Sequence, residues 1–205
     1  SVKDYQEIKK ILSKKKIKTW VNYPRRIYPF FKNLKKETEL SDLVRVRVSG
    51  KNWGLASNAI HMLDLFSFLT NETKMKIDFS RLNNKILSSK RNGYIEFTGK
   101  LNATTPKGDS LQLIDSEKID SPFKINIEFN NKRLEIFQEQ ELVVSYLDGK
   151  QCLKDYFYMP LQSEMTAGVV KNILKNHNSG LSSLDESFDL NCNMLNGFNS
   201  HLSSI

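Results

Sequence analysis

The pattern of apolar and polar residues predicts a helix over residues 50–70 that is buried on nearly every side. Its apolar residues do not keep to one face; they are Ala59, Ile60, Met62, Leu63, Leu65, Phe66, Phe68 and Leu69. That composition is typical of a core helix. A narrow polar stripe interrupts it, because Ser57, His61 and Asp64 recur at spacings of four and three and share a face. Buried polar groups need partners, so the stripe either bonds to neighbouring protein groups or lines a ligand cavity.

Similar periodicity predicts helices towards both ends of the chain. They are expected over residues 2–15, 24–34, 161–175 and 183–202. Pro24 suits the first turn of the second of these helices, and Gly180 follows the third as a stop signal. The spacing of Ser183 and Glu186 is typical of a capping box, which indicates where the last helix begins.

Alternating residues and turn pairs predict a sheet in the middle of the chain. Residues 43–49 alternate between apolar and polar side chains, which indicates a strand with one buried face, and residues 17–23 form a shorter candidate strand. Hairpin-type pairs separate the β-rich runs of residues 74–157: Asn92-Gly93, Lys107-Gly108, Asn130-Asn131 and Asp148-Gly149. We therefore expect an antiparallel meander and an α+β fold, a large open mostly antiparallel sheet with helices packed on one face.

Composition agrees with an ordinary globular domain. The chain has 205 residues, of which 39% are hydrophobic and 26% charged, enough to fold around its own core. No apolar run approaches the roughly 20 residues that cross a bilayer, and the N-terminal residues lack a signal-peptide core. The two cysteines, Cys152 and Cys192, make no disulfide framework, so we expect them reduced and buried. These features favour a cytoplasmic location and no membrane contact.

A net charge of +8 raises the question of an anionic partner. Much of the surplus lies in the lysines and arginines before residue 37, which fits a solvated basic face as well as it fits binding. No zinc-ligand spacing and no basic-aromatic RNA motif accompanies these residues, so we expect no nucleic acid. An anionic small substrate, such as a nucleotide-linked sugar, would also suit a basic cleft.

Two groups of residues are candidates for chemistry. His61 and Asp64 lie at i and i+3, where a carboxylate can fix the tautomer of an imidazole and raise its basicity; the alternative is a core histidine bonded to a neighbour. Arg25 and Arg26 follow a strand in the segment from Asn22 to Pro29, where forked donors can hold phosphate or carboxylate; the alternative is a pair of surface arginines.

Other chemistries are excluded by missing motifs. The sequence contains no Gly-x-Gly-x-x-Gly, no Gly-Lys-Ser/Thr loop and no Gly-x-Ser-x-Gly. His177 and His201 do not fall at a metal-binding spacing with another histidine, so no metal site is expected. The chain cannot hold a dinucleotide in the usual way.

The order of these features resembles the C-terminal domain of the Gfo/Idh/MocA oxidoreductases. The resemblance depends on a strand followed by Asn-x-x-Arg-Arg-x-x-Pro, a helix, an alternating strand, Gly-x-Asn-Trp-Gly, and an apolar helix with His-x-x-Asp-Leu. It is strongest over residues 1–70. It implies an open sheet that binds the substrate and often forms a dimer interface. In this family a Rossmann domain, whose Glu-Lys-Pro lysine is catalytic, precedes that sheet.

The resemblance also assigns roles to residues of this chain. His61 matches the histidine of the family's Asp-x-Gly-x-His motif and is the expected catalytic residue, assisting proton transfer while hydride passes between a sugar and nicotinamide. The family's aspartate falls on Ser57 and its glycine on Ala59, and a serine cannot act as the same base. Arg26 matches an arginine that lies near the substrate in many members. The residues expected to contact substrate are Asn22, Arg25, Arg26, Ser57, Asn58 and Asp64.

The resemblance divides the chain into two parts and suggests its function. Residues 1–23 are expected to be the last helix and strand of a nucleotide-binding domain, and residues 24–205 a substrate-binding and oligomerisation domain. The chain begins at Ser1 without methionine, which indicates a piece of a longer protein. The parent protein would use NAD or NADP to oxidise or reduce a sugar or nucleotide-sugar, by analogy in surface-polysaccharide synthesis. This piece alone would bind no NAD, lack activity and form a homo-oligomer. The alternatives are a non-catalytic protein-interaction domain and a basic nucleic-acid-binding domain.

Overall fold

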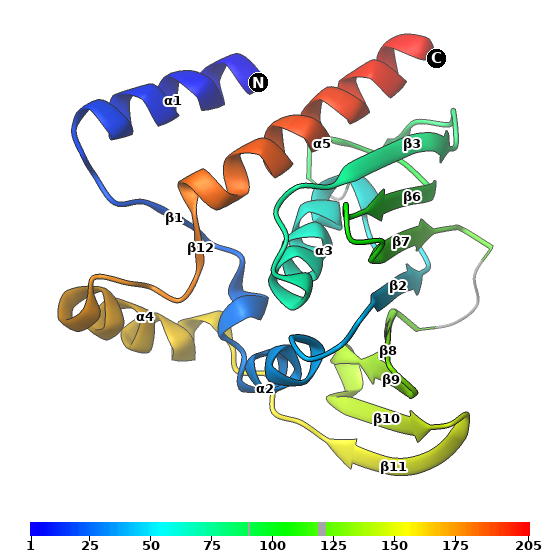
Figure 1. Ribbon diagram of the computed structural model, residues 1–205. Coiled ribbons are helices and arrows are strands. Elements are labelled where there is room, and N and C mark those ends of the chain that lie inside the picture. The colour runs from blue at the N-terminus through cyan, green and yellow to red at the C-terminus, as the bar shows by residue number, and fades with distance from the viewer. Residues whose placement is uncertain (90, 119–121) are drawn as a thin grey trace.

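The computed structural model describes residues 1–89, 91–118 and 122–205. Its α-helices are α1 (Val2–Lys14), α2 (Pro29–Thr38), α3 (Leu55–Thr70), α4 (Gln162–Asn176) and α5 (Leu184–Ser204). Two short 3-10 helices accompany them, η1 (Pro24–Ile27) and η2 (Gln138–Gln140). In Figure 1 the main sheet lies on the right, α1 and α4 lie on the left, and α5 runs from the left to the upper right above β3.

The main sheet has eight strands in the order β11-β10-β9-β8-β2-β7-β6-β3. In chain order they are β2 (Val44–Gly50), β3 (Lys76–Leu82), β6 (Gly99–Thr104), β7 (Ser110–Asp115), β8 (Lys124–Phe129), β9 (Lys132–Phe137), β10 (Leu142–Leu147) and β11 (Lys150–Tyr156). Two small ladders complete the strands: β1 (Trp20–Val21) with β12 (Ser182–Ser183), and β4 (Leu87–Ser88) with β5 (Ile95–Glu96). All neighbouring strands of the main sheet are antiparallel except β2 and β7, which are parallel.

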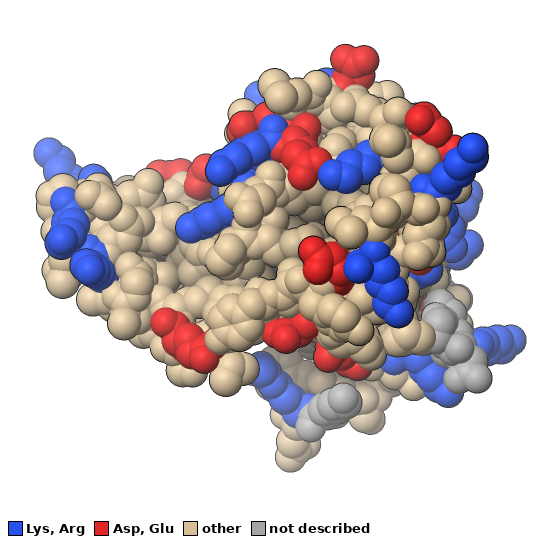
Figure 2. Space-filling model, turned by 90° about the horizontal axis from the view of Figure 1, so that it is seen from below, with Lys and Arg blue, Asp and Glu red and all other residues tan. Residues whose placement is uncertain are grey.

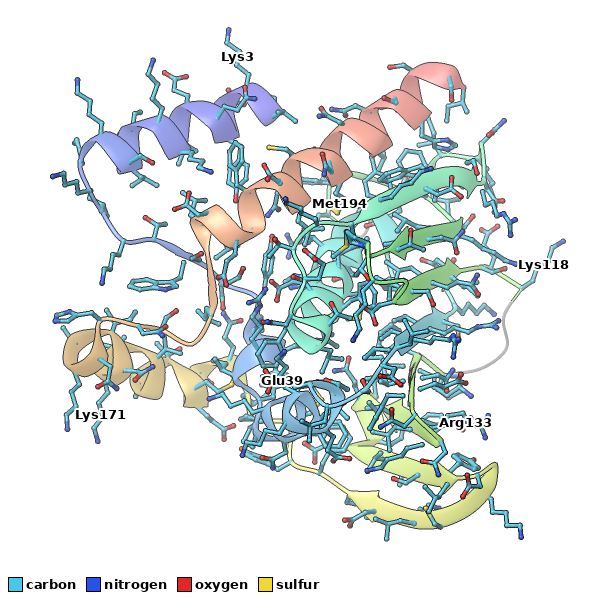
Figure 3. The ribbon with its side chains drawn as sticks, viewed as in Figure 1. Lys3, Glu39, Lys118, Arg133, Lys171 and Met194 are labelled. Carbon is cyan, nitrogen blue, oxygen red and sulfur yellow. The ribbon has the colours of Figure 1, made fainter. Side chains whose placement is uncertain are left out.

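Helices cover one face of this sheet. In β2 the valines are buried and the two arginines between them are exposed, because only one face of the strand meets the core. Helices α3 and α5 contact that buried face, and α2 packs against α3 (Figure 1). Met194 on α5 points into the packed interior, while Lys3 and Lys171 point away from the molecule (Figure 3). The predicted α+β class, with helices on one face of an open sheet, is confirmed.

The predicted core helix is α3. Ten of its sixteen residues are buried, including Phe66 and Leu69 with no exposed surface. Its ends are set by residues in left-handed conformation, Gly54 before it (φ 80°) and Asn71 after it (φ 56°). Asparagine and glycine tolerate that conformation better than other residues, so the chain turns sharply at both ends. The helix is thereby held across the middle of the sheet.

The N-terminal segment folds back onto the last helix. Tyr5 of α1 stacks on Phe188 of α5 at 5.2 Å between ring centroids, and the ammonium group of Lys9 lies 4.0 Å from the same ring. Part of the apolar surface of α1 is uncovered, since Ile8 and Ile11 are about half exposed (50% and 49%). The assignment of residues 1–23 to a separate nucleotide-binding domain stays a prediction.

Three expectations are corrected by the structure. The helix predicted from Pro24 to residue 34 is broken, because Pro29 forces Tyr28 into an extended conformation (ψ 131°) between η1 and α2. The strand predicted over residues 17–23 shrinks to the two residues of β1. Cys152 is exposed on the edge strand β11, although Cys192 is buried as expected.

The turn pairs correctly predict the hairpin between β10 and β11, but the predicted simple meander is wrong in one respect. Asp148 and Gly149 both have positive φ and join β10 to β11, as a type I′ turn requires. The strands do not form a simple meander, however, because β2 lies between β7 and β8. Turn pairs identify neighbours in sequence, whereas the position of β2 depends on which strands bury its valines.

Candidate functional site

The polar stripe begins where α3 begins, and carboxylates from two strands meet it there. Asp115 at the end of β7 accepts the backbone N–H groups of Gly54 (3.1 Å) and Leu55 (3.2 Å) through Oδ2. Glu96 of β5 accepts the N–H of Ala56 at 2.8 Å. Acidic groups are favourable at a helix N terminus because they complement its unpaired N–H groups and its dipole. The positive end of α3 is therefore already occupied by protein acids.

Ser57 and Asn58, both expected to contact substrate, take part in this cap. The hydroxyl of Ser57 donates a hydrogen bond to Glu96. The Asn58 side chain donates to the carbonyl groups of Trp53 (2.7 Å) and Gly54 (3.1 Å). Ser57 is exposed, and its hydroxyl oxygen keeps its capacity to accept a hydrogen bond. A substrate role for either residue stays a prediction, but both have a structural role at the start of α3.

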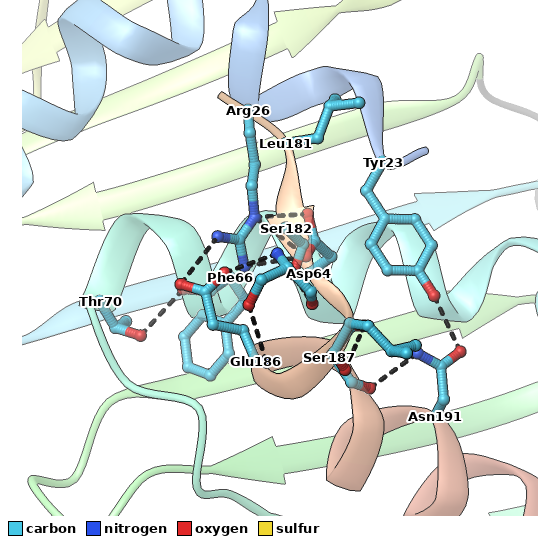
Figure 4. A network of polar contacts seen from close by, with 12 residues as sticks. Tyr23, Arg26, Asp64, Phe66, Thr70, Leu181, Ser182, Glu186, Ser187 and Asn191 are labelled. Carbon is cyan, nitrogen blue, oxygen red and sulfur yellow. Dashed lines mark hydrogen bonds and ion pairs between the residues drawn. The ribbon is translucent and has the colours of Figure 1, made fainter. Parts of the chain in front are cut away.

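Asp64 and Arg26 form a buried ion pair (Figure 4). The Arg26 Nε lies 2.9 Å from Oδ2 and 3.0 Å from Oδ1 of Asp64, and Nη2 lies 2.9 Å from Oδ1. Only 1% of the Asp64 side chain and 11% of the Arg26 side chain are exposed. Burial raises the pKa of Asp64 to about 6, and the Arg26 guanidinium opposes that rise. The pair joins η1 to α3, and Glu186 of α5 lies 4.0 Å from Arg26 on its outer side.

The predicted contact between Asp64 and His61 is absent from the described residues. Asp64 is used by Arg26, and the Nδ1 atom of His61 is buried without a hydrogen-bond partner. The ring of Tyr23 meets the imidazole edge to face at 5.3 Å between centroids, and the Tyr23 hydroxyl donates to Asn191 (2.8 Å). Asp64 thus fixes the position of Arg26 and does not orient the imidazole.

Two effects lower the pKa of His61 below its usual 6.5. Burial is the larger, because it disfavours the charged imidazolium, and the positive charge of Arg25 adds to it. His61 is therefore neutral at pH 7, with a ring nitrogen that can accept a proton. That is the state which general-base catalysis requires.

Arg25, the neighbour of Arg26 in sequence, has no carboxylate partner within 4.0 Å among the described residues. Its Nη2 donates to the side-chain oxygen of Gln138 at 2.9 Å, and its Nε is buried with no hydrogen bond. Burial lowers the pKa of Arg25 to about 10. Asn22, at the end of β1, is exposed, and its side chain makes no hydrogen bond to the described residues. The structure thus buries part of the Arg25 guanidinium and leaves Asn22 at the surface.

Other parts of the described chain offer less chemistry. A cavity of about 830 Å³ lies between the end of α1, β1 and the start of α5; Arg26 lines it, but His61 and Arg25 do not. No three His, Cys, Asp or Glu side chains gather as a metal site within residues 1–89, 91–118 and 122–205. Among the described helices, none combines the length and the apolar character needed to cross a bilayer.

The helix N termini of this chain do not suit a dinucleotide. A pyrophosphate binds where a glycine-rich turn exposes the N–H groups of a helix start. Here α1 begins beside Asp4, α4 beside Glu164, α5 beside Glu186, and α3 beside Asp115 and Glu96. Carboxylates at these four helix starts repel a second anion, and α2 begins at Pro29, which has no N–H to donate and follows no glycine-rich turn. That this chain alone binds no cofactor stays a prediction.

Some residues of the site were not identified by sequence reasoning. Tyr23 lies inside the Asn-Tyr-Pro-Arg-Arg segment, and its aromatic ring next to two arginines was an available signal. Gln138 and Glu96 reach the site from η2 and β5, more than 35 residues from the side chains they bond. Nothing local in the sequence connects them to Arg25 or Ser57.

Solved structures share this architecture over nearly the whole chain. Aldose-aldose oxidoreductase from Caulobacter crescentus, complexed with glycerol, matches with a TM-score of 0.67 at 12% identity, over 100% of this chain and 67% of that one. The super-repressor mutant of Gal80p from Saccharomyces cerevisiae gives 0.65 at 12% identity, over 100% and 69%. UDP-N-acetylglucosamine 3-dehydrogenase GnnA from Acidithiobacillus ferrooxidans gives 0.65 at 10%, over 98% and 66%.

These proteins are oxidoreductases and relatives of the Gfo/Idh/MocA type. The chain has the fold of their C-terminal domain. It spans about two thirds of the length of each matched Gfo/Idh/MocA-type protein. No protein-family model and no curated protein matches the sequence. At 9–14% identity, the likeness to Gfo/Idh/MocA-type proteins establishes the fold alone. The activity has to be argued from the residues of the site.

Proposed function

We propose that this chain is the substrate-binding domain of an NAD(P)-dependent oxidoreductase that acts on a sugar or nucleotide-linked sugar. The observation that carries the proposal is His61, an imidazole with an unpartnered Nδ1 and a lowered pKa, on the helix where the Gfo/Idh/MocA pattern has its histidine. Two matched proteins, the aldose-aldose oxidoreductase and GnnA, bear names that describe sugar oxidoreductases.

His61 would handle the proton of the reaction. Oxidation of a sugar alcohol removes a hydride from carbon and a proton from the hydroxyl group, and a nicotinamide, when bound, accepts the hydride. A neutral imidazole within hydrogen-bond reach of that hydroxyl can take its proton at a ring nitrogen. The cofactor itself would be held outside this chain, since four of the five described α-helices begin beside carboxylates.

Ser57 changes which residue is expected to accept the proton. In the Gfo/Idh/MocA pattern an aspartate precedes the histidine by one turn, and here a serine occupies that position with its hydroxyl bonded to Glu96. A serine hydroxyl is a poor base near pH 7, so the proton-accepting role falls on His61. This substitution alters the mechanism and leaves His61, whose Nδ1 has no hydrogen-bond partner, as the candidate base.

The test is a turnover assay on the product of the complete reading frame that encodes this chain. Reduction of NAD or NADP is followed at 340 nm with a panel of free and nucleotide-linked sugars. We expect His61→Asn to lower kcat by about 10²–10⁴-fold, the usual contribution of a general base. His177→Asn is the matched control, because His177 is exposed after α4. Equal turnover in the two variants would remove His61 from the reaction.

A non-catalytic interaction domain is the second candidate. It is favoured by the match to Gal80p, whose name describes a super-repressor, and by the serine in place of the acid. The two proposals separate cleanly in the same assay, since an interaction domain reduces no cofactor with any sugar. Figure 2 supports neither a broad basic surface nor nucleic-acid binding on the face it shows, where acidic and basic side chains are interspersed.

We also propose that the chain self-associates. Ile8 and Ile11 on α1 and Ile17 after it are each about half exposed, at 50%, 49% and 52%. Exposed apolar groups of this kind favour burial against another surface. Light scattering at tens of micromolar should show a dimer or larger species, and Ile8→Lys/Ile11→Lys should reduce it to monomer. A wild-type monomer at that concentration would refute self-association.

A further inference from the structure

A second groove lies between α4 on one side and η1 and α2 on the other, and we call it the α2–α4 groove. Its volume is about 490 Å³, within the roughly 300–1,000 Å³ typical of small-molecule sites. Residues of those three helices line it, together with Ser179 in the loop after α4. His61, Arg25 and Arg26 do not line it, so the α2–α4 groove is separate from the site described above.

Three ammonium groups line the α2–α4 groove, and none of its lining residues is Asp or Glu. Lys32 of α2 lies on one side, and Lys171 and Lys175 of α4 lie on the other. All three side chains are exposed, and within residues 1–89, 91–118 and 122–205 no carboxylate lies within 4.0 Å of their Nζ atoms. Positive charges that gather without a counter-ion repel one another, and a bound anion removes that repulsion.

The dipole of α4 accounts for only a small part of this charge. Lys175 lies in the last turn of α4, where the macrodipole is equivalent to about half a negative charge. Lys171 is one turn earlier, and Lys32 belongs to a different helix. About two and a half positive charges are therefore left without a counter-charge from the helix, more than a single carboxylate neutralises.

The buried part of the α2–α4 groove supplies a hydroxyl donor and apolar surface. Only 3% of Ser179 is exposed, and its Oγ accepts the backbone N–H of Leu181 at 3.0 Å. Its O–H group finds no acceptor among the residues that the structure describes, and a buried donor without an acceptor is unfavourable. Ile27 and Val169, both partly buried, contribute apolar surface to the same groove. An anion with several oxygen atoms and an apolar body matches both features.

We infer that the α2–α4 groove binds a small phosphomonoester with an apolar body. A phosphate group carries about −1.5 to −2 charge at pH 7 and three strong acceptor oxygens. These oxygens can accept from the ammonium groups on both sides of the groove and from the Ser179 hydroxyl. The ligand would join α2 to α4, which has no buried residue of its own. This site goes beyond the proposed function, because the two share no residue.

The test is calorimetric titration of the 205-residue chain in about 0.15 M salt, where distant exposed charges are screened. The probe is phenyl phosphate. Benzoate has the same ring with a single charge, and inorganic phosphate has the charge without the ring. We expect phenyl phosphate to bind at least tenfold more tightly than benzoate, the size of one charge-assisted hydrogen bond, and more tightly than inorganic phosphate.

Variants assign the binding to this groove. Lys32→Gln/Lys175→Gln removes one ammonium group from each side and should weaken phenyl phosphate binding at least tenfold. Ser179→Ala removes the hydroxyl donor and should weaken it several-fold. The matched control is Lys150→Gln/Lys154→Gln, which makes the same change of net charge at two exposed positions of β11 and should bind like wild type. Circular dichroism confirms that each variant is folded before titration.

Three results overturn the inference. The first is equal affinity for phenyl phosphate and benzoate, or binding of neither. The second is an equal loss of affinity in the two double-lysine variants, which would be an effect of net charge alone. The third concerns a lipid headgroup as the source of the phosphate: cosedimentation with phosphatidylcholine vesicles that contain phosphatidate, without binding of phenyl phosphate. The turnover assay on His61 is independent of all three, so these results leave the proposed function standing.

Discussion

Removing the guanidinium of Arg26 should destabilise the protein far more than removing that of Arg25. Arg26→Met leaves the carboxylate of Asp64, only 1% exposed, without the cation that holds it at 2.9–3.0 Å. Breaking a buried pair from one side typically costs about 3–5 kcal/mol, because the remaining charge stays buried and unpaired. For a domain of this size that corresponds to a fall in Tm of roughly 6–20 °C.

Arg25→Met should behave differently. Arg25 has no carboxylate partner among the described residues, so methionine removes an unpaired buried charge and loses one hydrogen bond to Gln138. These terms oppose each other, and the expected change is within about 1 kcal/mol in either direction. The double variant Arg26→Met/Asp64→Leu removes both buried charges and should recover most of the loss.

The pH dependence gives an independent check. The folded pKa of Asp64 is raised above its unfolded value of 3.8 to about 6, so the folded state binds more protons in that window. Stability from this group therefore falls as pH rises from about 4 to 6 and is level above. Without Arg26 the folded pKa rises further, so the variant should continue to lose stability above pH 6.

Urea unfolding of the wild type and of the three variants at pH 5 and pH 8 measures all of these terms. We expect Arg26→Met to lose more stability at pH 8 than at pH 5. Arg25→Met should show a smaller difference, which comes from His61, because removing the charge of Arg25 raises the pKa of that imidazole. Losses of equal size in the two single variants would refute the distinction between a paired and an unpaired buried arginine. So would an Arg26→Met protein as stable as wild type at pH 8.

Three further predictions follow from other contacts. Gly197→Ala should destabilise the protein by about 1–3 kcal/mol in thermal unfolding, because a Cβ there would lie 2.0–2.5 Å from the ring of Phe79. The control is Gly168→Ala, which should not destabilise the protein because no atom lies within 4 Å of a Cβ at that position. The chain should show no micromolar affinity for NADH in calorimetry, since four of its five described α-helices begin beside carboxylates, and a micromolar Kd would contradict that. Asp115→Asn should lower Tm, because Asp115 caps α3 at Gly54 and Leu55, and a Tm equal to wild type would show that the cap contributes nothing.

The elements whose signal is local were predicted well. The apolar composition of residues 55–70 identified α3, the alternating valines identified β2, and Asp148-Gly149 identified a hairpin. Each depends on periodicity or on backbone conformation within a few residues. The break between η1 and α2 also had a local signal, since the residue before Pro29 is disfavoured in a helix.

The predictions that failed concern side chains whose partners are distant in the sequence. Spacing placed Asp64 next to His61, but Arg26, 38 residues earlier, lies closer and carries the charge that a buried carboxylate needs. Glu96 reaches Ser57 across 39 residues. Periodicity shows which residues share a helix face, and it does not show which other element covers that face. The candidate histidine was therefore identified, and its surroundings were not.

The proposed proton transfer requires His61 to be a neutral imidazole that Asp64 does not hold. The measurement is an NMR titration of its ring Cε1–H signal in the 205-residue chain, which has only three histidines and is assigned with His61→Asn. We predict a pKa below 6.5 that rises in Arg25→Gln, because burial and the charge of Arg25 both lower it. A pKa above 6.5 in wild type, the mark of a carboxylate partner, would contradict the account.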